Sequence, residues 1–284
     1  LVLILFWFRN KSFFTKGSFD VNIAKELLRI GLPLLPTFLI YWIYNSVDKI
    51  MITNMLGTFD LGIYSIGSKM AQASQLIYAG FAGGWQYFAF STMKDDDQVQ
   101  LNSKVFEYLG AITVLSFIVI FPFIPIMFNF LFTGDYVLGY IVAPYLFLSP
   151  LLLMLFQIVA NQFLVIKRSY FATLSLSLGA CINVVLNFLL IKKIGIEGAA
   201  IATLIGYLIT LITVMYVSFK TRCMQYSRRI ILILSIIPVY SFIQRTISQE
   251  NKVVQFLSMF IMCILIVILY RNEFSQVFKK VVNR

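Results

Sequence analysis

Amide, hydroxyl and small side chains recur every three or four residues inside one apolar segment, residues 61–91. On a helix this spacing puts them on one face, where they can offer hydrogen bonds to a ligand. Lys69 borders that face, and a lysine near the middle of a membrane costs about 2.5–3.5 kcal/mol unless it meets water or an acid. We predict that the face lines an aqueous cavity, the alternative being that Lys69 extends to the outer surface. The stripe consists of Ser65, Ser68, Gln72, Gln75, Ala79, Gly83 and Gln86.

The preceding apolar segment, residues 31–50, also has a polar face. It carries Thr37, Tyr41, Asn45 and Asp48 at helical spacing. Asp48 is a carboxylate near the outer end of this segment, and Lys49 follows it directly. Two interpretations remain open. Asp48 is either solvated at the interface beside Lys49 or pairs with Lys69 in one state of a changing protein.

Three further amides lie deep inside apolar segments and complete the candidate site. Asn161 follows Gln157 by four residues, and Asn187 follows Asn183 by four, so each pair shares one side of a helix. Such groups need a partner or a hydrated cavity, because an unpaired polar group in lipid costs several kcal/mol. Packing between helices is the alternative use of the same side chains. The predicted cavity-lining residues are Lys69, Asp48, Gln72, Gln75, Gln86, Asn161, Asn183 and Asn187.

The composition predicts an all-α protein that crosses a membrane many times. Of the 284 residues 60% are hydrophobic and 12% are charged, more apolar material than a soluble core of this size needs. A spanning helix takes about 20 mostly apolar residues. We predict a polytopic bundle of eight full spans: residues 31–50, 61–91, 105–128, 139–166, 170–191, 198–219, 230–247 and 253–270.

The net charge of +11 is explained by membrane topology rather than by nucleic acid. Seventeen Lys and Arg residues fall on one side of the predicted spans, five fall on the other, and Lys69 lies within a span. By the positive-inside rule the basic side, with the C-terminus, is cytoplasmic, where it also meets anionic lipids. No nucleic-acid partner is expected.

The residue types argue against an enzyme. The sequence contains no histidine, which is the usual zinc ligand and general base. A zinc enzyme or a triad hydrolase is therefore a poor interpretation of this sequence. The three cysteines fall in two spans and one loop and suggest no disulfide framework. We expect no catalytic residue, no metal site and no cofactor.

The order of apolar and basic stretches predicts four regions. Residues 1–8, LVLILFWF, are interpreted as the remnant of a truncated transmembrane helix, because the basic residues follow the apolar run instead of preceding it. Residues 9–30 form a basic cytoplasmic linker, and residues 31–219 form a six-helix lobe. Residues 220–284 supply two peripheral transmembrane helices and a basic tail. On this interpretation the chain is a fragment of a longer protein.

Three stretches resemble the C-terminal half of Wzx-type lipid-linked oligosaccharide flippases, polysaccharide biosynthesis proteins of the MOP superfamily. They are SVDKIMITNMLGTFDLGIYSIGSKMA (46–71), GGWQYFAFSTMK (83–94) and NVVLNFLLIKKIGIEGAAIATLIGY (183–207). The resemblance implies the second, MATE-like lobe of a two-lobe transporter in the bacterial cytoplasmic membrane. It implies an undecaprenyl pyrophosphate-linked repeat unit as substrate, for O-antigen, lipopolysaccharide, capsule or exopolysaccharide assembly. Membrane lipids and polysaccharide assembly proteins are the implied partners.

Other functions remain open from the sequence. A cation-coupled multidrug exporter has the same architecture, but Asp48 is nearly the only carboxylate available for coupling. A membrane polysaccharide polymerase or ligase has a similar composition, but usually a large outer loop, and the loops here are short. An inactive half-transporter is a further alternative.

Overall fold

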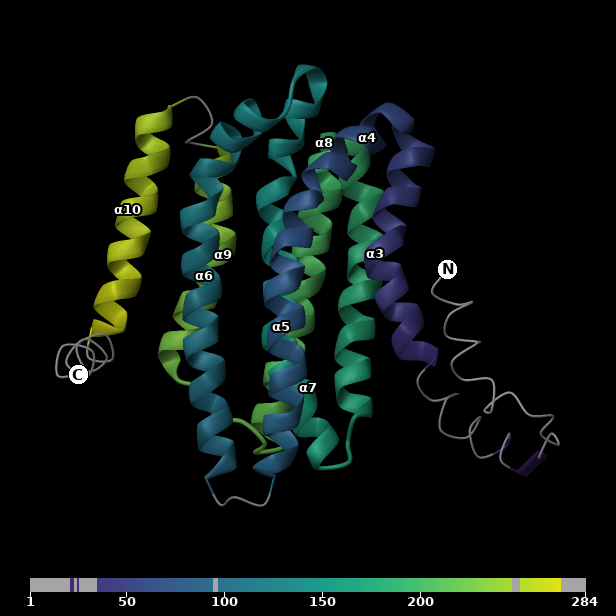
Figure 1. The fold of residues 1–284 in the computed structure, drawn as a ribbon, viewed down its shortest axis with the longest axis vertical. Coiled ribbons are helices and arrows are strands. Elements are labelled where there is room, and N and C mark those ends of the chain that lie inside the picture. The colour runs from purple at the N-terminus through teal and green to yellow at the C-terminus, as the bar shows by residue number, and fades with distance from the viewer. Residues whose placement is uncertain (1–20, 23–24, 26–34, 94–96, 247–250, 272–284) are drawn as a thin grey trace, which may run out of the picture. The chain divides into compact units, whose positions relative to one another are not determined.

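A computed structural model of the chain describes residues 21–22, 25, 35–93, 97–246 and 251–271. Its two compact units are residues 1–39 and 40–284, and the account below concerns the second. All regular structure within the described ranges is helical (Figure 1). The predicted all-α class is therefore confirmed. Residues 1–8 and most of the predicted 9–30 linker lie outside these ranges.

From residue 35 onward, the described ranges contain eight α-helices and one 3-10 helix. They are α3 (Leu35–Met55), α4 (Thr58–Gly67), α5 (Lys69–Ser91), α6 (Gln98–Leu131), η3 (Gly134–Ile141), α7 (Ala143–Val165), α8 (Tyr170–Lys220), α9 (Arg228–Thr246) and α10 (Lys252–Leu269).

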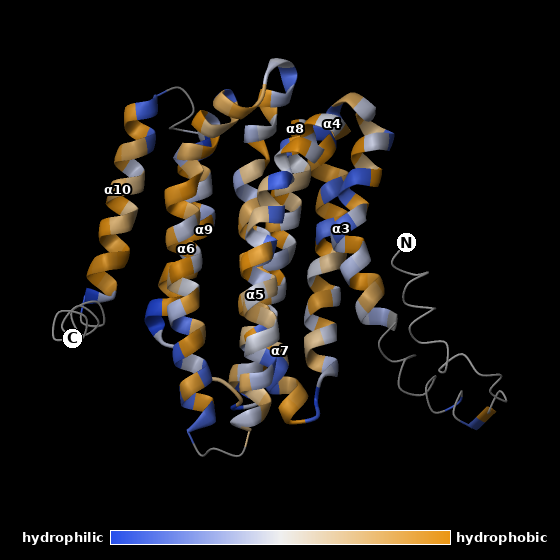
Figure 2. Ribbon diagram, viewed as in Figure 1, coloured by the Kyte–Doolittle hydropathy of each residue, from blue (hydrophilic) through white to orange (hydrophobic). Residues whose placement is uncertain are grey.

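Helix α7 forms the core of the second unit. Nearly all of its residues are buried, because α5, α6 and α8 each pack against it. Its sequence is almost continuously apolar, which is the pattern of a helix covered on all sides. Helices α9 and α10 pack against α6, and α10 is hydrophobic along nearly its whole length (Figure 2). The core therefore fixes one face of α5 and leaves its other face uncovered.

Helix α8 is a hairpin of two antiparallel helices. Its 51 residues would extend about 77 Å as one helix, more than twice the roughly 30 Å hydrocarbon core. The chain instead turns at Ile194 and Gly195, and Gly195 has a φ of 63° that suits glycine. After the turn a Cβ on Gly198 would lie 2.4 Å from the carbonyl oxygen of Leu190. This is the corner at which the sequence separates spans 170–191 and 198–219.

Five helices in the described ranges are long and apolar enough to cross a membrane, namely α6, α7, α8, α9 and α10. Since α8 contains two spans, these helices account for six of the eight predicted segments. The other two correspond to α3 and to α4 with α5, whose polar side chains lower their hydropathy; α3 shows such a hydrophilic stretch in Figure 2. The chain is a membrane protein, and the count of eight spans stays a prediction.

The predicted single span 61–91 is interrupted at Ser68. The structure ends α4 at Gly67 and begins α5 at Lys69. Backbone hydrogen bonds still cross this position, from Ser68 N–H to Tyr64 and from Ala71 N–H to Ser68. Lys69 is therefore the first residue of α5 instead of a mid-helix residue.

Candidate functional site

The exposed face of α5 holds the largest group of predicted site residues. Trp85 and Ala89 face the core, whereas Lys69, Gln72, Gln75 and Gln86 are all exposed. The three glutamines make no side-chain hydrogen bond within the described ranges, and neither does Lys69. The structure thus leaves these four polar groups available to a ligand or to water.

The same exposed face is also partly apolar. Leu76, Ile77 and Tyr87 are exposed, Tyr87 with 78% of its surface accessible. At 100° per residue the glutamines fall on one side of this face, and the three apolar residues fall on the other side together with Lys69. The face of α5 is therefore amphipathic, and its polar half is the one that the sequence stripe predicts.

A close contact between two glycines fixes the start of α5. A Cβ on Gly67 would lie 2.5 Å from the carbonyl oxygen of Gly139 in η3 and 2.3 Å from a methyl group of Val142. Real Cβ atoms do not come so close to backbone, so only glycine allows α4 to pack this tightly on η3. The contact holds Lys69 in place, two residues further along the chain.

Asp48 belongs to a different environment, a buried polar cluster between α3, α4 and α8. Only 5% of Asp48 is exposed. Its carboxylate accepts hydrogen bonds from the Tyr64 hydroxyl and from the backbone N–H of Lys49, the latter over 2.8 Å. Thr203 in the second half of α8 lies beside Tyr64. The carboxylate of Asp48 thus has its hydrogen-bond partners inside the fold.

Asn183 and Asn187 continue this cluster into the α8 hairpin. The amide of Asn183 donates to Thr203 over 3.2 Å, and the amide of Asn187 donates to Asn183 over 3.3 Å. Both residues are buried, Asn187 completely. Tyr44 of α3 closes one side of the same region through its hydroxyl contact with Thr210, 2.9 Å away. The bond of Asn183 joins the two halves of α8, whereas the bond of Asn187 lies within the first half.

Asn161 lies in the buried helix α7. Its carbonyl oxygen accepts from Gln157 over 2.9 Å, and it is fully buried. Its amide nitrogen has no partner within the described ranges. The structure places Asn161 in the interior rather than on the exposed face of α5.

The eight predicted residues therefore form two groups. Lys69, Gln72, Gln75 and Gln86 lie together on the exposed face of α5, and the other four, Asp48, Asn161, Asn183 and Asn187, are buried and hydrogen-bonded. Within the described ranges Arg245 forms an ion pair with Glu197, and Asp48 and Lys69, which the sequence pairs in one state of the protein, are not paired in this structure. Asp48 has Tyr64 as its partner instead.

Sequence reasoning missed Tyr64 and Glu197. Tyr64 stands in an apolar pattern and resembles a core aromatic residue, so only tertiary contact reveals its bond to Asp48. Glu197, at the α8 corner, pairs with Arg245 of α9 over 2.8 Å and accepts from the Tyr145 hydroxyl over 3.3 Å. This contact ties the corner to α7 and α9.

No group of three or more His, Cys, Asp or Glu side chains that could hold a metal occurs within the described ranges. The arrangement on α5 offers one cation and several amides on an open face. It can bind an anionic, hydroxyl-rich molecule without covalent chemistry.

A family model described as polysaccharide biosynthesis protein matches residues 1–145, just over half of the chain. The chain belongs to this family of polysaccharide biosynthesis proteins. The match covers α3, α4, α5 and α6, and therefore includes the whole exposed face of α5.

One curated relative is an uncharacterised membrane protein of Methanocaldococcus jannaschii, 24% identical over 194 residues. The match covers 67% of this chain and 45% of the relative, so the chain spans about half the length of the curated relative it matches.

Two solved structures share the fold. The lipid II flippase MurJ, in an inward closed conformation, aligns with a TM-score of 0.63 and 17% identity, over 95% of this chain and 60% of that one. A MOP superfamily transporter from Pyrococcus furiosus aligns with a TM-score of 0.53 and 19% identity, over 73% of this chain and 49% of that one. The chain therefore shares its fold with MurJ and with this MOP superfamily transporter.

Proposed function

We propose that the chain is part of a flippase that moves an undecaprenyl pyrophosphate-linked oligosaccharide across the bacterial cytoplasmic membrane. The observation that carries this proposal is the uncovered face of α5, with Lys69, Gln72, Gln75 and Gln86 exposed on a helix that packs against α7. Polar side chains on a membrane helix require an aqueous surrounding or a polar ligand. A cavity for a hydrophilic headgroup supplies both.

The residue types on α5 fit the parts of such a substrate. The Lys69 ammonium is the cation for the pyrophosphate, since a phosphate oxygen accepts strong hydrogen bonds from a charged donor. The glutamine amides both donate and accept, so they suit sugar hydroxyls. Because flipping breaks no bond, the site needs no nucleophile, general base or cofactor.

The family and the fold support the same proposal. The chain belongs to a family of polysaccharide biosynthesis proteins, and a structure with the same fold is named a lipid II flippase. Residues 31–219 are proposed as one lobe around the substrate, with residues 220–284 as two peripheral helices and a basic tail. Since the chain spans 60% of MurJ, the activity of a whole transporter is part of the proposal.

The buried polar cluster is assigned a supporting role. Asp48 accepts from Tyr64, and Asn183 donates to Thr203, so these residues join α3 to α4 and the two halves of α8 behind the cavity wall. In this proposal the basic helix ends lie in the cytoplasm, as the positive-inside rule requires.

Complementation of a flippase-null strain tests the proposal. Lys69→Ala, expressed from the whole gene at the wild-type level, is expected to reduce surface polysaccharide at least tenfold, and Lys69→Arg to restore most of it. Lys193→Ala is the matched control, because Lys193 is an exposed lysine at the outer corner of α8. Full activity of Lys69→Ala would refute the role of Lys69, and absence of complementation by the wild-type gene would refute the flippase proposal.

A further inference from the structure

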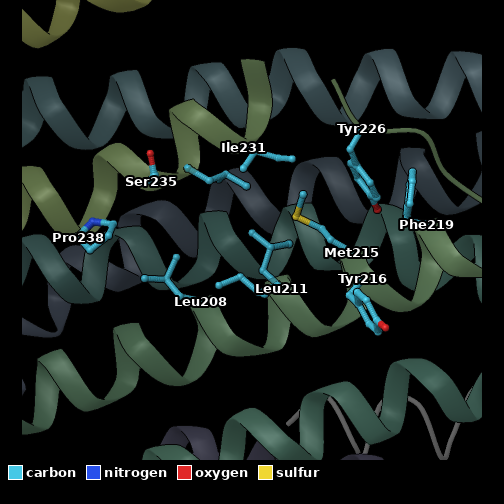
Figure 3. Close-up of a pocket in the computed structure, with 11 residues that line it drawn as sticks. Leu208, Leu211, Met215, Tyr216, Phe219, Tyr226, Ile231, Ser235 and Pro238 are labelled. Atoms are coloured by element: carbon cyan, nitrogen blue, oxygen red, sulfur yellow. The ribbon is translucent and has the colours of Figure 1, made fainter. Parts of the chain in front are cut away.

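An apolar groove runs between the second half of α8 and helix α9, away from the exposed face of α5. Its volume is about 640 Å³, within the roughly 300–1,000 Å³ of ligand sites. Side chains from both helices converge on it, with Tyr226 at one end (Figure 3). Its lining includes Leu208, Leu211, Met215, Phe219, Ile231 and Pro238.

The groove has the length of one bilayer leaflet. From Leu208 to Phe219 a helix rises about 16 Å, and half of the hydrocarbon core is about 15 Å. Leu208 and Pro238 lie at one end, and Phe219 and Tyr226 lie at the other (Figure 3). The groove therefore suits a chain that enters from the membrane surface and ends near the bilayer centre.

Three basic residues lie in the chain close to Phe219 and Tyr226, the residues at one end of the groove. Lys220 is next to Phe219, Arg222 lies in the loop, and Arg228 begins α9. All three are exposed, and none forms an ion pair within the described ranges. A negatively charged group at this end of the groove would meet cations that have no acidic partner.

The loop that carries these cations is held in place. Ser103 of α6 accepts from the backbone N–H of Gln225 over 2.9 Å. The Tyr226 hydroxyl contacts the Ser218 hydroxyl over 2.7 Å. Burial raises the pKa of the Tyr226 phenol, so it stays neutral at physiological pH. The end of the groove is therefore a fixed feature.

Arg222 occupies a backbone position that normally belongs to glycine. Its φ is 58°, and it closes α8 with bonds from Arg222 N–H to Phe219 and from Cys223 N–H to Ser218. This is the Schellman arrangement, in which the left-handed residue is usually glycine. Arg222 therefore places a positive charge at a left-handed backbone position that glycine would adopt with less strain.

We propose that this groove binds one acyl chain of an anionic phospholipid whose phosphate lies at Lys220, Arg222 and Arg228. The apolar lining takes the chain, and the cations take the headgroup, as in other basic sites between transmembrane helices. A phospholipid chain fits a groove of one leaflet depth, whereas a much longer polyisoprenoid would extend beyond it. The proposal is independent of the flippase function, because the groove does not include the α5 face.

Arg222→Gly separates charge from folding. Glycine accepts the left-handed φ without strain, so this variant is expected to fold at least as well as the wild type. Lys167 offers a matched control, since it also has a φ of 58° and closes α7 with the same pair of backbone bonds. Lys167→Gly removes one cation from an identical setting that does not adjoin the groove.

The test compares the purified chain in nanodiscs of phosphatidylcholine alone and of phosphatidylcholine mixed with phosphatidylglycerol. We expect phosphatidylglycerol to raise the Tm of the wild type by about 5 °C. Native mass spectrometry should show one retained phosphatidylglycerol. Arg222→Gly and Arg228→Gln should each weaken its binding about fivefold, and Lys167→Gly should leave it unchanged.

Filling the groove tests the acyl-chain part. Ser235 is exposed and lines the groove, whereas Val239, one turn further along α9, is exposed and does not. Ser235→Trp should abolish retention of phosphatidylglycerol, and Val239→Trp should not. Equal Tm values in both nanodiscs, equal losses in Arg222→Gly and Lys167→Gly, or displacement of phosphatidylglycerol by a polyisoprenyl phosphate would each overturn the proposal.

Discussion

Asn183 in the first half of α8 donates a hydrogen bond of 3.2 Å to Thr203 in the second half. The bond therefore crosses the hairpin that the corner at Gly195 creates. Thr203 also contacts Tyr64 of α4, the residue that donates to Asp48. Thr203 thus joins the two halves of α8 and lies beside α4.

Removing the Thr203 hydroxyl should weaken the hairpin. Thr203→Val keeps the shape of the side chain but leaves the amide of Asn183 without its acceptor, so we expect a loss of about 0.6–1.7 kcal/mol in unfolding free energy. Denaturant titration in detergent micelles measures this change. Thr213→Val on the same helix is the control, because Thr213 is only half-buried.

A double-mutant cycle identifies the source of the loss. If Asn183→Ala and Thr203→Val remove the same bond, the double variant should lose less than the sum of the two single losses. Strict additivity would show that the hydrogen bond does not contribute to stability.

Glycines let the two halves of α8 approach one another. A Cβ on Gly179 would lie 2.4 Å from the carbonyl oxygen of Gly206 and 2.0 Å from the Thr210 hydroxyl. Gly179→Ala should therefore cost about 1–3 kcal/mol or more, because backbone must move to admit the methyl group. Gly80→Ala should be neutral or stabilising by up to about 1 kcal/mol, since nothing lies within 4 Å of that position. A neutral Gly179→Ala in the same unfolding assay would contradict the tight packing.

The Tyr64 hydroxyl is expected to contribute more to the stability of the fold than an exposed tyrosine hydroxyl does. Tyr64→Phe leaves the buried carboxyl group of Asp48 without its side-chain partner, at an expected cost of about 1–3 kcal/mol. Tyr136→Phe should change stability little, because Tyr136 is exposed. Comparing the thermal unfolding of both variants checks this expectation, and equal Tm values would contradict it.

The sequence predicts the polar face of α5 because a helical stripe depends only on spacing. Gln72, Gln75 and Gln86 keep that spacing, and the structure leaves all three exposed. The corner at Gly195 is likewise local, because a glycine and charged residues interrupt two apolar runs.

The burial of Asp48 and Asn183 could not be predicted in the same way. Each has the spacing of a cavity residue, but whether it meets water or another helix depends on which helices pack beside it. Tyr64 and Thr203 are far apart in sequence and come together only through the contact of α4 with α8. Spacing within one helix contains no information on that contact.

The central claim is that the polar half of α5 faces water inside the membrane. In a variant whose three native cysteines are replaced by serine, single cysteines at Gln72, Gln75 and Gln86 can be probed in intact cells with a small, membrane-impermeant maleimide. Matched cysteines at Asn183 and Asn187 report on the buried cluster. We predict labelling at the three glutamine positions and none at the two asparagine positions. Unreactive cysteines at all three glutamine positions, both in intact cells and in inverted vesicles, would contradict the account.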